Sequence, residues 1–124
     1  MYKSFEDLEV SKRACQLAVR LYKALENCRD FGLKDQMQRA AVSIASNIAE
    51  GSERHGKDFA RFLGISRGSC AELRTQLYLA ARVEIISDAT MRELVDETKQ
   101  ISKMLYALGK SLNTENETIL SPEY

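Results

Sequence analysis

Proline, histidine and tryptophan are scarce in this 124-residue chain, which has one proline, one histidine and no tryptophan. The proline, Pro122, lies almost at the end. Long helices are therefore allowed from Met1 to Ser121, because proline is what most often interrupts a helix. The histidine, His55, has no Cys, His or Asp partner at metal-ligand spacing. We therefore expect a helical protein with no metal and no cofactor.

Long hydrophobic runs are also missing. No stretch approaches the roughly 20 uncharged residues that a membrane-spanning helix needs. Acidic side chains precede the first apolar run, which argues against a signal peptide. The three cysteines, Cys15, Cys28 and Cys70, are odd in number and lack metal-type spacing. They are typical of reduced thiols in a cytoplasmic protein, and no membrane contact is expected.

Neither sign of charge is in excess over the whole chain, which has 18 basic and 18 acidic side chains. Residues 113–124 contain three acids and no base, so residues 1–112 carry 18 positive against 15 negative side chains, a net of +3. This mild balance differs from that of a strongly basic nucleic-acid-binding domain.

What the chain does have is apolar residues at spacings of three and four, in four separate patterns. These patterns predict helices over about residues 5–28, 34–50, 57–83 and 88–112. Four amphipathic helices with short connections indicate a single domain. The predicted fold is an all-α, antiparallel up-down-up-down four-helix bundle over residues 1–112, followed by a flexible acidic tail over residues 113–124.

Several polar residues and glycines are predicted to mark the helix ends. Ser4 is a plausible cap for the first helix, and Ser87 with Asp88 for the last. Gly32 is expected to supply an unusual backbone angle in a turn over Arg29–Leu33. Gly51 is expected to stop the second helix, because glycine adopts the left-handed conformation at low cost.

The stretch from residue 39 to 77 organises the chain and contains a set of polar side chains at helical spacing. We interpret this set as a hydrogen-bond network that fixes helix register, with a binding pocket as the alternative. Catalysis is not expected, since no nucleophile is paired with a general base. The set comprises Arg39, Ser43, Asn47, Glu50, Arg67, Ser69 and Glu72.

A row of small residues follows the apolar face of the third predicted helix: Ala60, Gly64, Gly68, Ala71 and Thr75. Each glycine inside a helix costs about 1 kcal/mol relative to alanine, so a close approach of another backbone should compensate. We therefore predict that this row is an oligomer interface.

A group of basic residues near the middle turn is the candidate nucleic-acid contact. Arg54, Lys57 and Arg61 lie close together in sequence, beside His55. Clustered cations hold phosphates in a salt-dependent way, and several copies in an oligomer would multiply the effect. The alternative is an ordinary solvated helix start, because acidic residues are interspersed.

A second set of arginines, Arg67, Arg74 and Arg82, is partly aligned on the third predicted helix. We expect these side chains to pair with Glu72 or with acids on other helices rather than to contact RNA.

Three separated motifs carry a family resemblance: FEDLEV, then GLKDQMQRAAVSIASNIAEG at Gly32–Gly51, then FLGISRGSCAELRTQL at Phe62–Leu77. On these motifs the chain resembles, over about residues 5–112, the four-helix-bundle proteins encoded by intervening sequences in bacterial 23S ribosomal RNA genes. The resemblance implies a homopentameric ring of bundles. Members of that family mostly lack an assigned activity. A similar fold serves as the accessory protein of diversity-generating retroelements, which associates with a reverse transcriptase and with nucleic acid.

The chain departs from the family pattern at two positions. Ser11 stands where the family usually has tryptophan, and Ala45 where it usually has proline. Losing a large buried aromatic costs about 3–5 kcal/mol, so either Ser11 lies near the surface or its surroundings repack. Alanine at position 45 removes a residue that kinks helices.

Together these patterns predict a non-enzymatic, self-associating bundle that binds structured RNA or a nucleoprotein partner, and the resemblance implies that the oligomer is a homopentamer. The alternative is a protein-protein interaction scaffold with no nucleic-acid role, which the neutral charge balance favours. Charge reversal at Arg54, Lys57 and Arg61 would separate the two.

Overall fold

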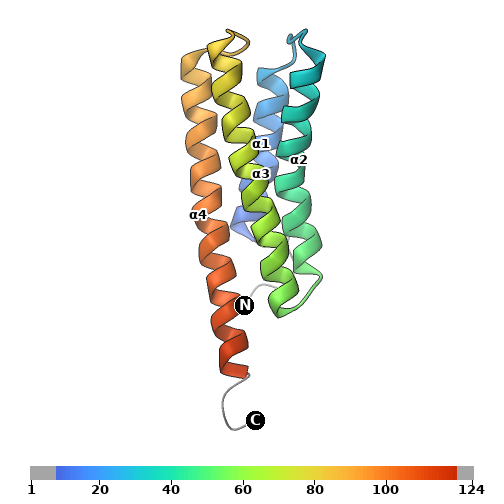
Figure 1. Ribbon diagram of the computed structural model, residues 1–124, viewed down its shortest axis with the longest axis vertical. Coiled ribbons are helices and arrows are strands. Elements are labelled where there is room, and N and C mark those ends of the chain that lie inside the picture. Colours follow the sequence, from blue (N-terminus) through green and yellow to red (C-terminus); the bar gives the residue numbers. More distant parts are fainter. Residues whose placement is uncertain (1–7, 120–124) are drawn as a thin grey trace.

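The computed structural model describes residues 8–119, and the side chains of residues 8–112. It is an all-α four-helix bundle. Each helix packs against two others: α3 against α2 and α4, and α1 against the same two. The α1–α2 and α3–α4 connections lie at one end of the bundle and the α2–α3 connection at the other (Figure 1). The helices are α1 (Glu9–Ala24), α2 (Phe31–Ser52), α3 (Gly56–Arg82) and α4 (Asp88–Ile119).

The core lies along the bundle axis and consists of the residues that recur at three-and-four spacing. In α4, for example, Leu94, Ile101 and Leu105 are buried, and so is Thr98 between them. Burying each large apolar side chain contributes roughly 1.5–3 kcal/mol, so this core accounts for most of the driving force for folding. Its largest fully buried side chains include Leu17, Leu21, Ile44, Ile48, Phe59, Leu63, Leu73, Leu77, Ile101 and Leu105.

The first connection differs from the predicted turn. Helix α1 ends at Ala24 rather than near residue 28, and α2 already begins at Phe31. The early start follows from Asp30, whose Oδ1 accepts a hydrogen bond from the Leu33 backbone amide at 3.0 Å and so caps the helix. Gly32 is therefore helical, and the turn predicted for Arg29–Leu33 is wrong. Ser4, the predicted cap of α1, lies outside the described residues.

Gly51 does not stop α2, which continues to Ser52. A Cβ atom at Gly51 would lie 2.7 Å from Phe62 Cβ and 3.0 Å from Phe59 Cδ1. Real Cβ atoms do not approach other atoms so closely, so the absence of a side chain lets α2 and α3 meet at this end of the bundle. The prediction of a stop was wrong because glycine here serves packing rather than backbone conformation.

Helix α4 begins at Asp88, as predicted, and Ser87 Oγ accepts a hydrogen bond from the Thr90 backbone amide at 3.1 Å. It continues to Ile119, beyond the predicted end at Leu112. The first part of the predicted tail, residues 113–119, is therefore helical, and residues 120–124 lie outside the described part of the chain.

The two departures from the family pattern lie in α1 and α2. Ser11 is only 5% exposed, so the alternative that places it near the surface is wrong. Ala45 is half-buried inside the continuous helix α2. No described helix is both long enough and apolar enough to span a membrane.

Candidate nucleic-acid interface

Three of the seven predicted network residues form a polar cluster between α2 and α3. The hydroxyls of Ser43 and Ser69 lie 2.8 Å apart. Asn47 Nδ2 donates to Ser43 Oγ and to the Ser43 carbonyl oxygen, each at 2.9 Å. Nearby, Ser66 Oγ donates to the carbonyl oxygen of Ile44 at 2.7 Å. The Ser43–Ser69 and Ser66–Ile44 bonds join α2 to α3 at fixed positions and so hold the two helices in register, while Asn47 orients Ser43 from within α2.

The structure does not bring the other four into this cluster. Arg39 pairs with Asp35 on its own helix at 2.8 Å, and Glu50 pairs with Arg54 at 2.7 Å. Arg67 points to α4, and Glu72 is exposed. The predicted network is therefore split between a helix-joining cluster and separate surface contacts.

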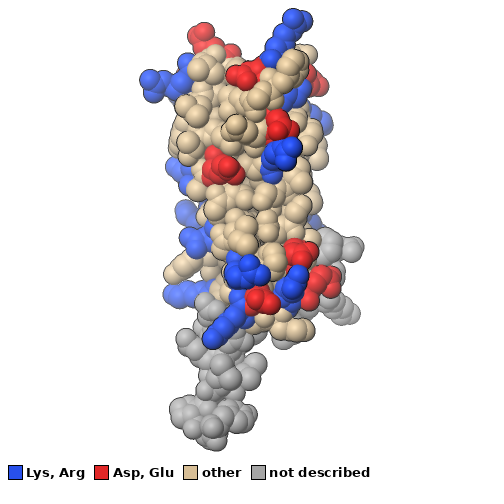
Figure 2. Space-filling model, turned by 45° about the vertical axis from the view of Figure 1, so that its right-hand side comes forward, with Lys and Arg blue, Asp and Glu red and all other residues tan. Residues whose placement is uncertain are grey.

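The middle-turn cluster, Arg54, Lys57 and Arg61, is largely neutralised by neighbouring acids. Arg54 pairs with Glu50, and Arg61 Nε lies 3.7 Å from Asp58 Oδ1. The hydrogen bond that Arg54 donates to Glu50 also raises the pKa of the Arg54 side chain. Basic and acidic side chains are intermingled near the lower end of the face in Figure 2.

Both arginines of this cluster also lie over one aromatic ring. The guanidinium carbons of Arg54 and Arg61 are 5.3 Å and 4.6 Å from the centroid of Phe62. These cation–π contacts fix the two side chains against the protein. The difference from a phosphate site lies in the ion pairs: Glu50 and Asp58 balance the charges of Arg54 and Arg61 locally, whereas a phosphate site needs cations whose charge is not balanced.

A second basic region lies between α3 and α4, and we call it the α3/α4 groove. It is a hollow of about 400 Å³ lined by Arg67, Arg74, Lys99, Ser102, Lys103 and Tyr106. None of the ion pairs among the described side chains involves its arginines or lysines. No Asp or Glu is among its lining residues in the described part of the chain. The groove therefore concentrates positive charge on a chain that is neutral overall.

Helix geometry places these cations together. Lys99, Lys103 and Tyr106 recur at spacings of four and three on α4, and Arg67 and Arg74 are two turns apart on α3. Arg74 Nε donates to Thr98 Oγ1 at 3.1 Å. The guanidinium of Arg67 lies 4.9 Å from the centroid of Tyr106. Both arginines are thus oriented by neutral groups and keep their full charge for a ligand.

The thiol of Cys70 lies in the core near both groove arginines. Burial raises the pKa of Cys70 to about 11, and the positive charges of Arg74 and Arg67 act in the opposite direction. Cys70 is therefore a protonated, unreactive thiol at neutral pH. All three cysteines are free, and no metal-holding group of His, Cys, Asp or Glu occurs among the described side chains.

A smaller cavity, which we call the glycine pocket, continues from the groove. Its volume is about 200 Å³, and it shares Arg67 and Tyr106 with the groove. Gly64 and Gly109 line it from α3 and α4, and Leu63 and Leu105 are its buried members. The two hollows together form one continuous surface feature along the α3/α4 boundary.

The small-residue row faces outward rather than into the bundle. Gly64, Gly68, Ala71 and Thr75 are exposed, and Thr75 Oγ1 donates to the Ala71 carbonyl oxygen of its own helix at 3.1 Å. A Cβ atom at either glycine would meet nothing within 4 Å. Of the row, Ala60 and Gly64 line the glycine pocket.

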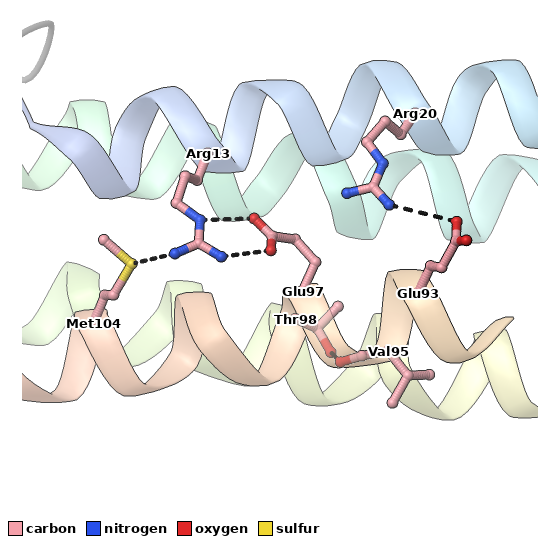
Figure 3. A network of polar contacts seen from close by, with 7 residues as sticks. All are labelled: Arg13, Arg20, Glu93, Val95, Glu97, Thr98 and Met104. Atoms are coloured by element: carbon pink, nitrogen blue, oxygen red, sulfur yellow. Dashed lines mark hydrogen bonds and ion pairs between the residues drawn. The ribbon is translucent and has the colours of Figure 1, made fainter. Parts of the chain in front are cut away.

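On its other side, α4 meets α1 through ion pairs, which Figure 3 shows from close by. Arg13 donates from Nε to Glu97 Oε2 at 2.8 Å and from Nη2 to Glu97 Oε1 at 2.5 Å. Its Nη1 also contacts Met104 Sδ at 3.4 Å. Arg20 and Glu93 form a longer pair at 3.9 Å. This α1/α4 interface is consistent with a structural role.

Sequence reasoning missed the α3/α4 groove because its cations come from two helices far apart in the chain. The expectation that Arg67 and Arg74 pair with acids is wrong among the described side chains. Arg82, the third member of that set, is exposed and does not line the groove. The available signal was the four-residue spacing of Lys99 and Lys103 with no acid between them.

Comparison with known proteins gives a family and similar solved structures. The family of 23S rRNA-intervening sequence proteins matches residues 6–107. A crystal structure of a protein of unknown function from the S23 ribosomal protein family of Bacteroides thetaiotaomicron is similar, with a TM-score of 0.76 and 28% identity. The match covers 82% of this chain and 98% of that one. No curated protein matches.

Proposed function

Because this chain belongs to the 23S rRNA-intervening sequence protein family, we propose that it is a non-enzymatic, self-associating protein that binds structured RNA. The phosphates of the RNA lie in the α3/α4 groove. The bundle, in an up-down-up-down arrangement, forms a homopentamer in the cytoplasm, where its three thiols stay reduced. No enzyme family is indicated by the comparisons.

The observation that carries this proposal is the cationic groove without acids. Arg67 and Arg74 face Lys99 and Lys103 across the boundary of two helices, and none of the four takes part in an ion pair among the described side chains. Each phosphate that such a side chain neutralises releases condensed counterions, so affinity falls steeply with salt. Like charges held close together repel one another and destabilise the folded state. Binding of a polyanion removes this repulsion.

The exposed row on α3 supports self-association. Gly68, which does not line the glycine pocket, leaves the backbone of a long helix open, and the apolar side chains of Val42, Ile65 and Leu79 are exposed on α2 and α3. The middle of the face in Figure 2 carries few charged side chains. A ring of five, which the family resemblance implies, would present five grooves to one RNA and multiply a modest affinity.

The test compares two charge reversals of the same size. Untagged protein is titrated with fluorescently labelled RNA hairpins at 50 mM salt and at increasing salt. The groove variant Lys99→Glu/Lys103→Glu should lose most of the affinity, whereas the control Lys57→Glu/Arg61→Glu in the middle-turn cluster should keep it. Light scattering on the same samples measures oligomer mass. Absence of wild-type binding at low salt, or equal losses in both variants, would contradict the proposal.

A protein-binding scaffold is the second candidate, and the exposed apolar side chains Val42, Ile65 and Leu79 favour it. In that case the groove variant would keep its partner, because the contact is apolar. Replacement of Ile65 by Glu would instead release the partner and leave the groove cations unchanged.

A further inference from the structure

We propose that the glycine pocket takes the base of an unpaired nucleotide whose flanking phosphates lie on the cations of the α3/α4 groove. The inference rests on the proposed function and narrows it, because it selects RNA with a bulge or loop over a fully paired duplex. The argument depends on three features of the pocket: the missing side chains, the aromatic edge and the continuity with the groove.

The two glycines leave space that the fold itself does not use. A Cβ at Gly64 would meet nothing within 4 Å, and a Cβ at Gly109 would meet only Leu63 Cδ1, at an ordinary 3.9 Å. Glycine inside a helix is unfavourable unless something needs the room. Elsewhere in the chain Gly51 has such a reason, since Phe62 and Phe59 occupy the place of its side chain. At Gly64 and Gly109, the space is a cavity of about 200 Å³.

The chemistry around this cavity suits a planar aromatic base. Leu63 and Leu105 are buried beneath the cavity, and the ring of Tyr106, 52% exposed, is the accessible apolar surface at its edge. Arg67 lies 4.9 Å and Lys110 Nζ 5.9 Å from the centroid of that ring. Aromatic rings and arginine planes are the surfaces on which proteins stack bases of single-stranded RNA.

The pocket and the groove are adjacent, so a single nucleotide chain reaches both. Arg67 and Tyr106 line both hollows, and the groove then continues past Lys103 to Lys99 and Arg74. In a paired A-form helix the faces of the bases are stacked on one another, so a protein reaches only phosphates, 2′-hydroxyls and the edges of the bases. An unpaired nucleotide has a free base to insert, so it gains contacts that a duplex cannot make.

The test uses two RNA hairpins of equal length, one fully paired and one with a single-nucleotide bulge, titrated at constant salt. We expect wild type to prefer the bulged hairpin by about tenfold, since base stacking on an aromatic side chain contributes that much. Gly64→Leu should fill the pocket, abolish this preference and leave affinity for the paired hairpin unchanged. Gly68→Leu is the matched control: it lies one turn further along the same row but does not line the pocket, so it should keep the preference for the bulged hairpin even if it lowers the oligomer mass.

Each outcome has a distinct meaning. Equal affinity of wild type for both hairpins would overturn the pocket and leave the proposed function intact, whereas binding to neither hairpin would overturn both. If Gly64→Leu and Gly68→Leu lose the preference for the bulged hairpin to the same extent, the loss comes from self-association and the pocket assignment is wrong. Thermal melting checks the fold of each variant, which leucine should not weaken because both positions are open.

Free nucleotides share the chemistry of a base beside a phosphate, so a competition separates them from RNA. A large excess of adenosine monophosphate should not displace the bulged hairpin, because one phosphate cannot engage the whole groove. Displacement would show that the pocket serves a mononucleotide and would overturn its assignment to RNA.

Discussion

The two sides of α4 carry charged residues at the same four-residue spacing and yet differ in kind. Toward α1, Glu93 and Glu97 meet Arg20 and Arg13 in ion pairs (Figure 3). Toward α3, Lys99 and Lys103 meet further cations and line the groove. Spacing alone therefore places charges on a helix face. The charge of the side chains on the neighbouring helix then decides whether that face becomes an interface or a binding surface.

The difference also separates stability from function. At the α1/α4 interface, opposite charges attract and a bidentate arginine–carboxylate contact orients two helices. In the α3/α4 groove, like charges repel, so the groove contributes nothing favourable to folding through Coulomb interactions. Substitutions on the two sides should accordingly change different measured quantities.

The largest expected effect is on RNA affinity. Lys99→Glu/Lys103→Glu removes two phosphate contacts, so the slope of log affinity against log salt should decrease in magnitude by about two. At 50 mM salt this corresponds to a loss of about 100-fold. The midpoint of urea unfolding should stay constant or rise, because repulsion is relieved. If the free energy of unfolding fell by as much as the free energy of RNA binding, the groove would be as important for stability as the α1/α4 interface, and the contrast between the two sides of α4 would be wrong.

On the α1 side, Glu97→Gln should act on stability alone. The side chains of Arg13 and Glu97 are 30% and 16% exposed, so the pair lies between a surface pair and a buried one. Removal of the charge should cost about 1–2 kcal/mol in urea unfolding. RNA affinity at fixed salt should not decrease. Asp35→Asn, in an exposed pair on α2, is the control and should change stability much less.

The core beneath the groove gives a pH-dependent prediction. The folded-state pKa of Cys70 is about 11, against an ordinary 9.0. The unfolded chain therefore releases this proton first as pH rises, and stability should fall between pH 9 and 11. The contribution at pH 10 is about 1.4 kcal/mol, because one proton per pH unit corresponds to that amount. The free energy of unfolding of Cys70→Ala should decrease less between pH 9 and 11 than that of wild type. Replacement of the exposed Cys15 should leave the wild-type decrease unchanged.

The sequence was sufficient for the parts of the molecule that depend on periodicity. Four helices and a buried row of apolar residues follow from three-and-four spacing, and Ser87 with Asp88 marked the start of α4. Helix ends were less predictable where one local contact decides them. Asp30 caps α2 and makes Gly32 helical, which composition alone does not distinguish from a turn.

The candidate site was harder to predict because it depends on which helices are neighbours. Arg54 and Arg61 are close in sequence, but Glu50 and Asp58 neutralise them at helical spacing, and Phe62 lies beneath both. The groove residues are dispersed over 40 positions of the chain, from Arg67 to Tyr106. Only the packing of α3 on α4 brings them together, so no local motif marks them.

The smallest expected effect is that of replacing a glycine. It tests whether Gly64 lowers the stability of the fold while keeping the pocket open. Gly64→Ala should raise the unfolding free energy by up to about 1 kcal/mol, since alanine is the better helix former and its Cβ meets nothing within 4 Å. Gly51→Ala, the matched change at the α2/α3 contact, should instead lower it, because the added Cβ would lie 2.7 Å from Phe62 Cβ and force repacking. Opposite signs for two identical substitutions, measured by urea unfolding, would show that Gly64 is not needed for folding. Equal destabilisation would mean that Gly64 is packed against something in the folded protein, most simply another copy of the chain, and the glycine pocket would then be part of an interface.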